Sequence, residues 1–100
     1  MLEQTVAMRP DEPLTEFALG KAHFDAGRTI NALVHFDRAV ELDPSLEDAR
    51  FARAVALLEI GRRDSAIVAL DSYLREFPDG VWAAEARSEL TRLANESVSP

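Results

Sequence analysis

The chain contains 100 residues with 47% hydrophobic content, no cysteine and a formal net charge of −7 at pH 7. A chain of this length forms one compact domain with a single small core, and the absence of cysteine excludes both a disulfide framework and a cysteine-ligated metal site. The acidic balance argues against nucleic acid and anionic lipid as partners, because both require clustered cations.

The first ten residues, MLEQTVAMRP, match the end of a segment that recurs later in the chain. Leu2 and Phe36 are separated by the same interval as Pro10 and Pro44. We expect residues 1–10 to form a short helix. Either this helix ends a preceding repeat whose first helix is missing because the chain was cut from a longer array, or it packs on the next helices as an amino-terminal capping helix. A helix of this length is marginal alone and needs packing partners.

The next two segments are predicted to form a helical hairpin. Residues 13–26 carry apolar side chains at helical spacing, and residues 29–42 restart the same period. Pro13 suits the first turn of a helix, and Gly27 suits a left-handed helix stop. Pro44 ends the second helix, because the residue before a proline avoids the helical region.

The same pattern begins again in the second half of the chain. A helix is expected from an N-cap at Ser45 to Gly61, because an acidic side chain follows Ser45 three residues on. Further helices are expected over residues 63–77 and 81–95. Residues 96–100 are expected to form a flexible tail. No segment has the pattern of a strand.

Proline and glycine recur at a fixed interval. Pro10, Pro44 and Pro78 are evenly spaced along the chain, and Gly27 and Gly61 repeat that interval. Superimposing residues 13–46 on residues 47–80 also aligns Phe17 with Phe51, Ala22 with Ala56, Ala32 with Ala66, and Phe36 with Leu70. So many coincidences at one offset indicate a helical repeat.

This period resembles that of the tetratricopeptide repeat (TPR) family, whose unit is a helix-turn-helix of about 34 residues with small residues at close helix contacts and a proline at its end. The residues that fit the family pattern are Leu19, Gly20, Ala32, Phe36, Ala39 and Pro44. The positions that depart from it are Glu16 and Arg50, where the family often has Trp, His23 and Leu57, where it often has Tyr, and Arg53, where it often has Leu.

The resemblance covers roughly residues 1–94 and implies an all-α fold. Antiparallel helix-turn-helix repeats would stack as a short right-handed superhelix, an α-solenoid. The first repeat spans residues 13–46 and the second residues 47–80, and residues 81–95 form a terminal capping helix.

The resemblance also implies that the first helix of each pair lines a concave face. The side chains expected in a peptide-binding groove on that face are Leu14, Phe17, Lys21, Phe24, Phe51, Val55, Leu58 and Trp82, with Asp25, Glu59, Glu85 and Glu89 beside them. Phe17, Phe51 and Trp82 are candidate hot spots for a peptide or helix, because aromatic side chains bury a large area at low entropic cost. The alternative is that they close the superhelix internally, with Trp82 covering the last hairpin.

Two known kinds of site are not expected. Family members that bind the carboxyl-terminal tails of heat-shock chaperones hold two carboxylates with Lys, Asn and Arg, whereas the matching places here are Phe17, Lys21, Ala52, Trp82 and Ala86. His23 and His35 lack a metal-ligand spacing and a nearby nucleophile, so we expect no metal, cofactor or catalytic site. We expect His23 to face the paired helix and His35 to lie on the outer surface.

The sequence therefore predicts a non-enzymatic scaffold module for protein–protein interaction that binds a peptide or helical segment in an apolar concave groove. The alternative is a self-association module, a homodimer, within a longer repeat protein. We expect no membrane insertion, since no apolar run approaches the roughly 18 residues of a membrane span. The amino terminus has no basic start, which favours the cytoplasm. Stretches such as FPDGVWAAEA are similar to repeats in bacterial regulatory and envelope-assembly proteins, so we expect a bacterial source.

Overall fold

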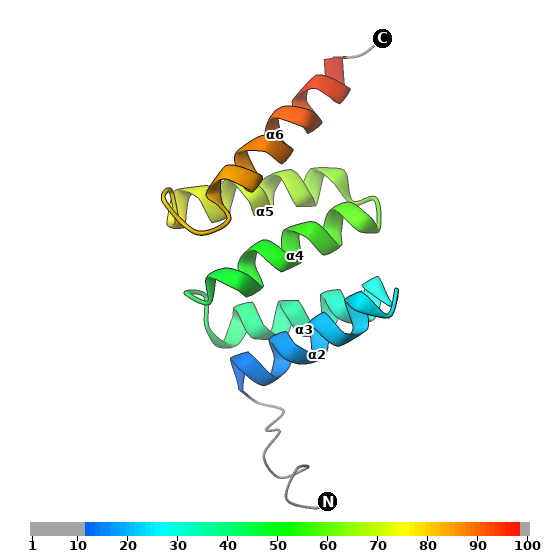
Figure 1. Cartoon of the computed structure of the whole chain (residues 1–100). Coiled ribbons are helices and arrows are strands. Elements are labelled where there is room, and N and C mark those ends of the chain that lie inside the picture. Colours follow the sequence, from blue (N-terminus) through cyan, green and yellow to red (C-terminus); the bar gives the residue numbers. More distant parts are fainter. Residues whose placement is uncertain (1–11, 99–100) are drawn as a thin grey trace, which may run out of the picture.

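The computed structural model describes residues 12–98, which form five helices stacked in chain order (Figure 1). The helices are α2 (Pro13–Asp25), α3 (Thr29–Leu42), α4 (Glu47–Glu59), α5 (Arg63–Glu76) and α6 (Ala83–Val98). No strand occurs within residues 12–98, and none of these helices is both long and apolar enough to cross a membrane. The predicted all-α solenoid is confirmed. The short helix predicted over residues 1–10 lies outside the described residues.

The two hairpins turn at glycine through the same hydrogen bond. Gly27 and Gly61 both have a φ of 83°, a left-handed conformation that glycine adopts without steric cost. In each turn the residue after the glycine donates its N–H to a carbonyl five positions earlier, at 2.8 Å in the first turn and 2.9 Å in the second. This bond satisfies a carbonyl that the helix end would otherwise leave unpaired. The predicted helix stops at both glycines are confirmed.

Small residues let the helices of the first half approach one another closely. Gly20 of α2 lies against Phe36 of α3, and a Cβ at that glycine would come within 2.5 Å of two ring carbons. Ala32 and Phe36 are buried and form a core cluster with Ala56 of α4. The close packing of α2 on α3 therefore requires glycine at position 20, since no larger residue fits beside the ring.

A larger core lies where α4, α5 and α6 meet. Its buried members are Ala54, Leu57, Ala66, Ala69, Leu70, Tyr73, Ala83, Ala86 and Leu93. Five of these nine residues are alanine, so the helices lie close together and few large side chains fill the space between them. Tyr73 and Leu70 are the largest of them that are fully buried.

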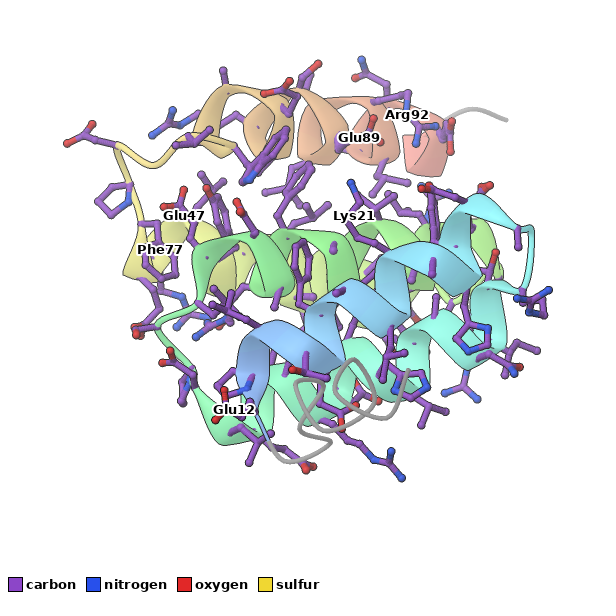
Figure 2. All side chains as sticks on the ribbon, turned by 60° about the horizontal axis from the view of Figure 1, so that its bottom comes forward. Glu12, Lys21, Glu47, Phe77, Glu89 and Arg92 are labelled. Carbon is purple, nitrogen blue, oxygen red and sulfur yellow. The ribbon has the colours of Figure 1, made fainter. Side chains whose placement is uncertain are left out.

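The hydroxyl of Tyr73 joins α5 to the start of α4 and to the turn before α6. It donates a hydrogen bond to the Glu47 carboxylate and accepts one from the backbone N–H of Trp82 at 2.9 Å. The same carboxylate accepts the N–H of Val81 at 2.6 Å. Glu47 stands at the end of α4 that faces this turn (Figure 2). A side chain at Gly80 would collide with both the carboxylate and the hydroxyl, so the turn requires glycine.

The start of α4 differs from the prediction. Ser45 was expected to cap this helix, but the helix begins at Glu47 and Leu46 takes the N-cap position without a side-chain bond. The Ser45 hydroxyl instead donates to the carboxylate of Asp43 at 2.6 Å, and the Ser45 N–H donates to the same oxygen at 3.0 Å. A local turn therefore uses the serine that the capping pattern assigned to the helix.

The last helix also differs from the prediction at both ends. α6 begins two residues later than expected, at Ala83, and the two preceding N–H groups bond to the side chains of α4 and α5. It continues through Val98, so residues 96–98 of the predicted flexible tail are helical. No glycine or proline stops the helix there, and Glu96 forms an ion pair with Arg63 of α5 at 3.1 Å.

Tyr73 is the only tyrosine of the chain, so its ionisation can be measured directly. Burial and the hydrogen bond to Glu47 raise its pKa from 10.0 to about 12. The folded protein then keeps a proton that the unfolded chain loses above its ordinary pKa. We expect the free energy of unfolding to fall as the pH rises from 10.0 towards about 12, as measured by urea denaturation, with phenolate absorbance reporting the pKa.

The Tyr73→Phe variant is the control, because it removes the titrating group and should flatten this part of the pH dependence. At neutral pH it should lower the free energy of unfolding by about 1–3 kcal/mol, since the N–H of Trp82 loses its acceptor. A phenolate that forms at the ordinary tyrosine pKa in the folded protein would contradict the arrangement.

Candidate binding groove

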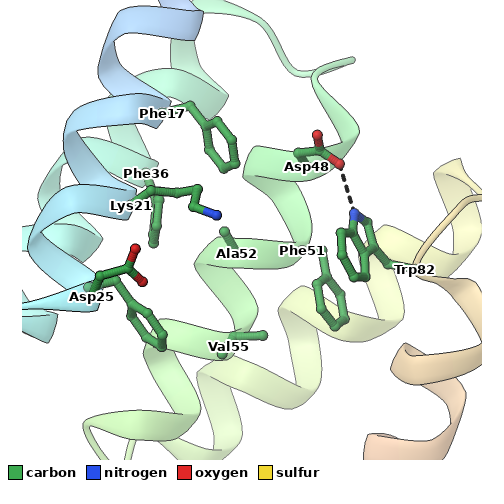
Figure 3. Close-up of a pocket in the computed structure, with 10 residues that line it drawn as sticks. Phe17, Lys21, Asp25, Phe36, Asp48, Phe51, Ala52, Val55 and Trp82 are labelled. Carbon is green, nitrogen blue, oxygen red and sulfur yellow. Dashed lines mark hydrogen bonds between the residues drawn. The ribbon is translucent and has the colours of Figure 1, made fainter. Parts of the chain in front are cut away.

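A hollow of about 360 Å³ opens between α2, α4 and the turn before α6 (Figure 3). Its lining residues are Phe17, Lys21, Phe24, Asp25, Phe36, Asp48, Phe51, Ala52, Val55 and Trp82. Four phenylalanines and the single tryptophan of the chain are among them. We call this space the aromatic hollow.

Helical spacing places the side chains of each helix on the same side. Phe17, Lys21 and Phe24 follow one another on α2 at intervals of four and three residues, which is the spacing of one helix face. Phe51 and Val55 repeat this arrangement on α4, one repeat after Phe17 and Lys21. The repeat thus brings two equivalent helix faces to one hollow.

The side chain of Trp82 is held firmly in the wall of the hollow. Its ring stacks on Phe51 with the ring centres 5.1 Å apart and the planes 2° from parallel. The indole Nε1–H donates to the Asp48 carboxylate at 2.8 Å, and the backbone N–H is bonded to Tyr73. Phe17 stands across the hollow, with its ring 5.8 Å from that of Phe36 (Figure 3). The aromatic walls are therefore fixed in place by neighbouring residues.

A second hollow of about 250 Å³ adjoins the first and shares Phe51 and Val55 with it. The other residues that line it are Leu58, Glu59, Leu70, Glu85, Glu89 and Arg92. We call it the acidic hollow, and the two together the groove. Apart from Phe36 of α3 and Leu70 of α5, the groove is built from α2, α4, α6 and the turn before α6.

A tetratricopeptide repeat model matches residues 23–90, from within α2 to within α6. The chain belongs to the tetratricopeptide repeat family. No curated protein matches the chain. TPRs are in general non-enzymatic modules for protein–protein interaction.

The structure brings most of the predicted TPR groove residues together. Phe17, Lys21, Phe24, Phe51, Val55 and Trp82 line the aromatic hollow, and Leu58 lines the acidic hollow. Leu14 lies outside both and is 67% exposed. The sequence suggested that Trp82 belongs to the terminal helix, but Trp82 lies in the turn before α6.

Three residues of the aromatic hollow, Phe36, Asp48 and Ala52, were not predicted to line the groove. Phe36 was identified only as a residue that fits the repeat pattern, and it reaches the hollow because Gly20 leaves room for its ring. Asp48 was seen only as an acidic residue near a helix start. The signal that could have revealed its role is its distance of one repeat from Trp82, since equivalent residues of successive TPRs lie side by side.

His35 is not on the outer surface, which corrects the prediction. Glu16 is only 2% exposed and accepts a hydrogen bond from His35 Nδ1 at 2.8 Å. The rings of His35 and His23 are stacked with their centres 5.3 Å apart, so His23 faces the paired helix as expected. His35 turns inward because of Glu16, which stands where TPRs often have Trp. A buried carboxylate requires a hydrogen-bond donor, and His35 supplies it.

These histidines have a structural role in the described chain. His23 Nδ1 accepts from the guanidinium of Arg28 at 2.9 Å. Within residues 12–98 no group of three or more His, Cys, Asp and Glu side chains could hold a metal ion. The hydrogen bonds of this cluster therefore serve the contact between α2 and α3.

The Glu16–His35 pair gives a prediction on stability. His35→Leu leaves the buried carboxylate without its donor, so the free energy of unfolding should fall by about 1–3 kcal/mol in thermal or urea denaturation. The double variant Glu16→Leu with His35→Leu should recover much of this loss, because replacing a buried polar pair by apolar groups is often neutral.

Arg38→Ala is the control for charge, since Arg38 is largely exposed and its nitrogen lies 3.9 Å from Glu16. Its effect should stay within about 1 kcal/mol. Equal stability of the single histidine variant and the wild type would refute the role of the pair.

Proposed function

We propose that the groove binds a segment of a partner protein, with an apolar side chain of that segment seated in the aromatic hollow. The observation that carries this proposal is the convergence of Phe17, Phe51 and Trp82, from two TPRs and the turn before α6, on one open apolar space. Aromatic residues in such a position are typical of binding hot spots. The volume of about 360 Å³ lies within the range of small ligand pockets.

The rigidity of the walls favours binding further. Phe51 is stacked on Trp82, with the ring centres 5.1 Å apart, and it packs against the tilted ring of Tyr73, whose centre lies 5.8 Å away. The indole is also fixed by its bond to Asp48. Because these side chains are already ordered, a ligand loses little of its binding free energy to arranging them.

The proposal is tested by blocking the groove. Val55→Arg places a long charged side chain in both hollows, and Phe17→Ala removes one wall of the aromatic hollow. For peptides selected by display against the wild-type protein, we expect either change to weaken binding by about tenfold or more in calorimetry.

Val68→Arg is the matched control. Val68 is 65% exposed on α5 and lines a different hollow, between α3 and α5. It should leave the affinity unchanged, and circular dichroism should show that all variants fold. Selected peptides that bind the groove variants as tightly as the wild type would refute the proposal.

Self-association is the second candidate, and one difference between the repeats favours it. Ala56 is fully buried against α3, whereas its counterpart Ala22 is exposed on α2. Leu14 and Ile30 of the same hairpin are each 67% exposed. No helix within residues 12–98 covers this side of the first hairpin, so it could pack against a second copy.

Sedimentation over a range of concentrations tests this second candidate. If the first hairpin joins two copies, Ala22→Glu should shift the mass to that of a monomer. Val68→Glu, which introduces the same negative charge at an exposed site of α5, should leave the mass unchanged. A monomer mass for the wild type at every concentration would exclude self-association.

A further inference from the structure

The groove carries more negative than positive charge. The carboxylates that line it are Asp25, Asp48, Glu59, Glu85 and Glu89, and the cations that line it are Lys21 and Arg92. Apolar side chains form the remaining surface of both hollows. A partner segment that enters the groove therefore meets apolar contacts and carboxylates together.

Three of these carboxylates are not compensated within the described chain. Asp25, Glu59 and Glu85 are exposed, and none of the ion pairs or side-chain hydrogen bonds among residues 12–98 involves them. Arg92 does not neutralise them, because it bonds to Glu89 at 2.6 Å and to Glu96 at 2.5 Å. Their charge is thus available to a ligand.

The arginines of α4 bind away from the groove. Arg53 pairs with Asp37 of α3, and Arg50 donates to Ser72 of α5 at 2.8 Å. Both line the hollow between α3 and α5, where Glu41 provides a further carboxylate. The cations of α4 therefore do not offset the negative potential on the opposite side, which would attract and orient a cationic ligand.

Lys21 limits where a cation of the ligand can lie. Its ammonium points into the aromatic hollow, beside Phe17 and Phe36 (Figure 3). In the view of the whole molecule, the side chain extends from α2 towards the side of α6 that carries Glu89 (Figure 2). No described carboxylate lies within ion-pair distance of it. A second cation in the aromatic hollow would be repelled by Lys21, whereas the acidic hollow contains Glu59 and Glu85 and no uncompensated cation.

We propose that the groove recognises a basic amphipathic segment, with an apolar side chain in the aromatic hollow and a Lys or Arg side chain in the acidic hollow. This inference rests on the proposed function and adds the charge of the partner to it. The carboxylates give the segment its direction, since the two hollows differ in charge and adjoin at Phe51 and Val55.

Three fluorescent peptides of about ten residues provide the probes. They share the same leucine and tryptophan positions and carry Lys, Gln or Glu at the remaining ones. With the wild-type protein we expect the lysine peptide to bind more tightly than the glutamine peptide by about fivefold or more at low salt, and the glutamate peptide to bind least. Raising the salt from about 50 to about 300 mM should weaken only the lysine peptide.

Three variants of the protein test where the charge effect arises. Glu59→Gln with Glu85→Gln should weaken the lysine peptide by about fivefold, whereas Glu41→Gln with Glu76→Gln, an equal change of charge at exposed sites outside the groove, should weaken it far less. Lys21→Met should strengthen the lysine peptide, because it removes a like charge while keeping an apolar stem.

Equal effects of the two double glutamine variants would overturn the inference, since they would show attraction to net charge alone. Tighter binding of the glutamate peptide, or weaker binding of the lysine peptide to Lys21→Met, would overturn it as well. If Val55→Arg weakens the glutamine peptide while the charge variants change nothing, this inference fails and the proposed function stands. If Val55→Arg weakens none of the peptides, the proposed function itself fails.

Discussion

The contact between the Tyr73 hydroxyl and the Glu47 carboxylate fixes the second half of the structure. It links the last turn of α5 to the start of α4, and both groups bond to the backbone that leads into α6. That backbone carries Trp82, whose ring forms one wall of the aromatic hollow. A single buried phenol thus determines where the last helix begins and how the groove is closed at that end. A phenylalanine at this position would fill the core equally well but would accept no hydrogen bond from the turn.

Small residues inside the stack and large residues on its surface have one common cause. Where α2 meets α3 and where α4 meets α5 and α6, glycine and alanine bring the helices close together. Phe36 and Tyr73 are the aromatic rings that are fully buried within this packing. Phe17, Phe24 and Phe51 are only partly buried and extend to the side formed by the first helices. The aromatic hollow is therefore a consequence of the tight packing behind it. The same packing that brings the helices together leaves these aromatic side chains on the side of the groove.

The sequence predicted those parts of the molecule that depend on spacing. The side of α2 and α4 that lines the groove was implied by the resemblance to the TPR family. The helices between residues 13 and 77 and the turns at Gly27 and Gly61 follow from the even spacing of the prolines and glycines and from the periodicity of the α-helix. Only local geometry is needed for these features, so a single chain is sufficient to show them.

Features that depend on contacts between distant side chains could not be predicted in the same way. The hydroxyl of Tyr73 bonds 26 residues away to Glu47, and both groups accept N–H groups of the turn before α6. Glu16 draws His35 into the interface because of its burial, which no local pattern reveals. Asp48 supports Trp82 across one repeat. In each of these cases the stacking of the helices brings the two groups together. Ser45 is a different case, because its hydroxyl bonds to Asp43 in a local turn that competes with the helix cap.

The hydrogen bond between Trp82 and Asp48 has a consequence for how the chain tolerates insertions and deletions. Its partners are separated by one repeat length, so they meet only if every intervening turn keeps its number of residues. An extra residue within α4 or α5 would rotate the rest of that helix by about 100° about its axis and would turn its face away from the groove. A single-residue insertion in the helices between Asp48 and Trp82 would therefore separate the two partners, whereas the addition of a whole repeat elsewhere in the stack would leave their register unchanged.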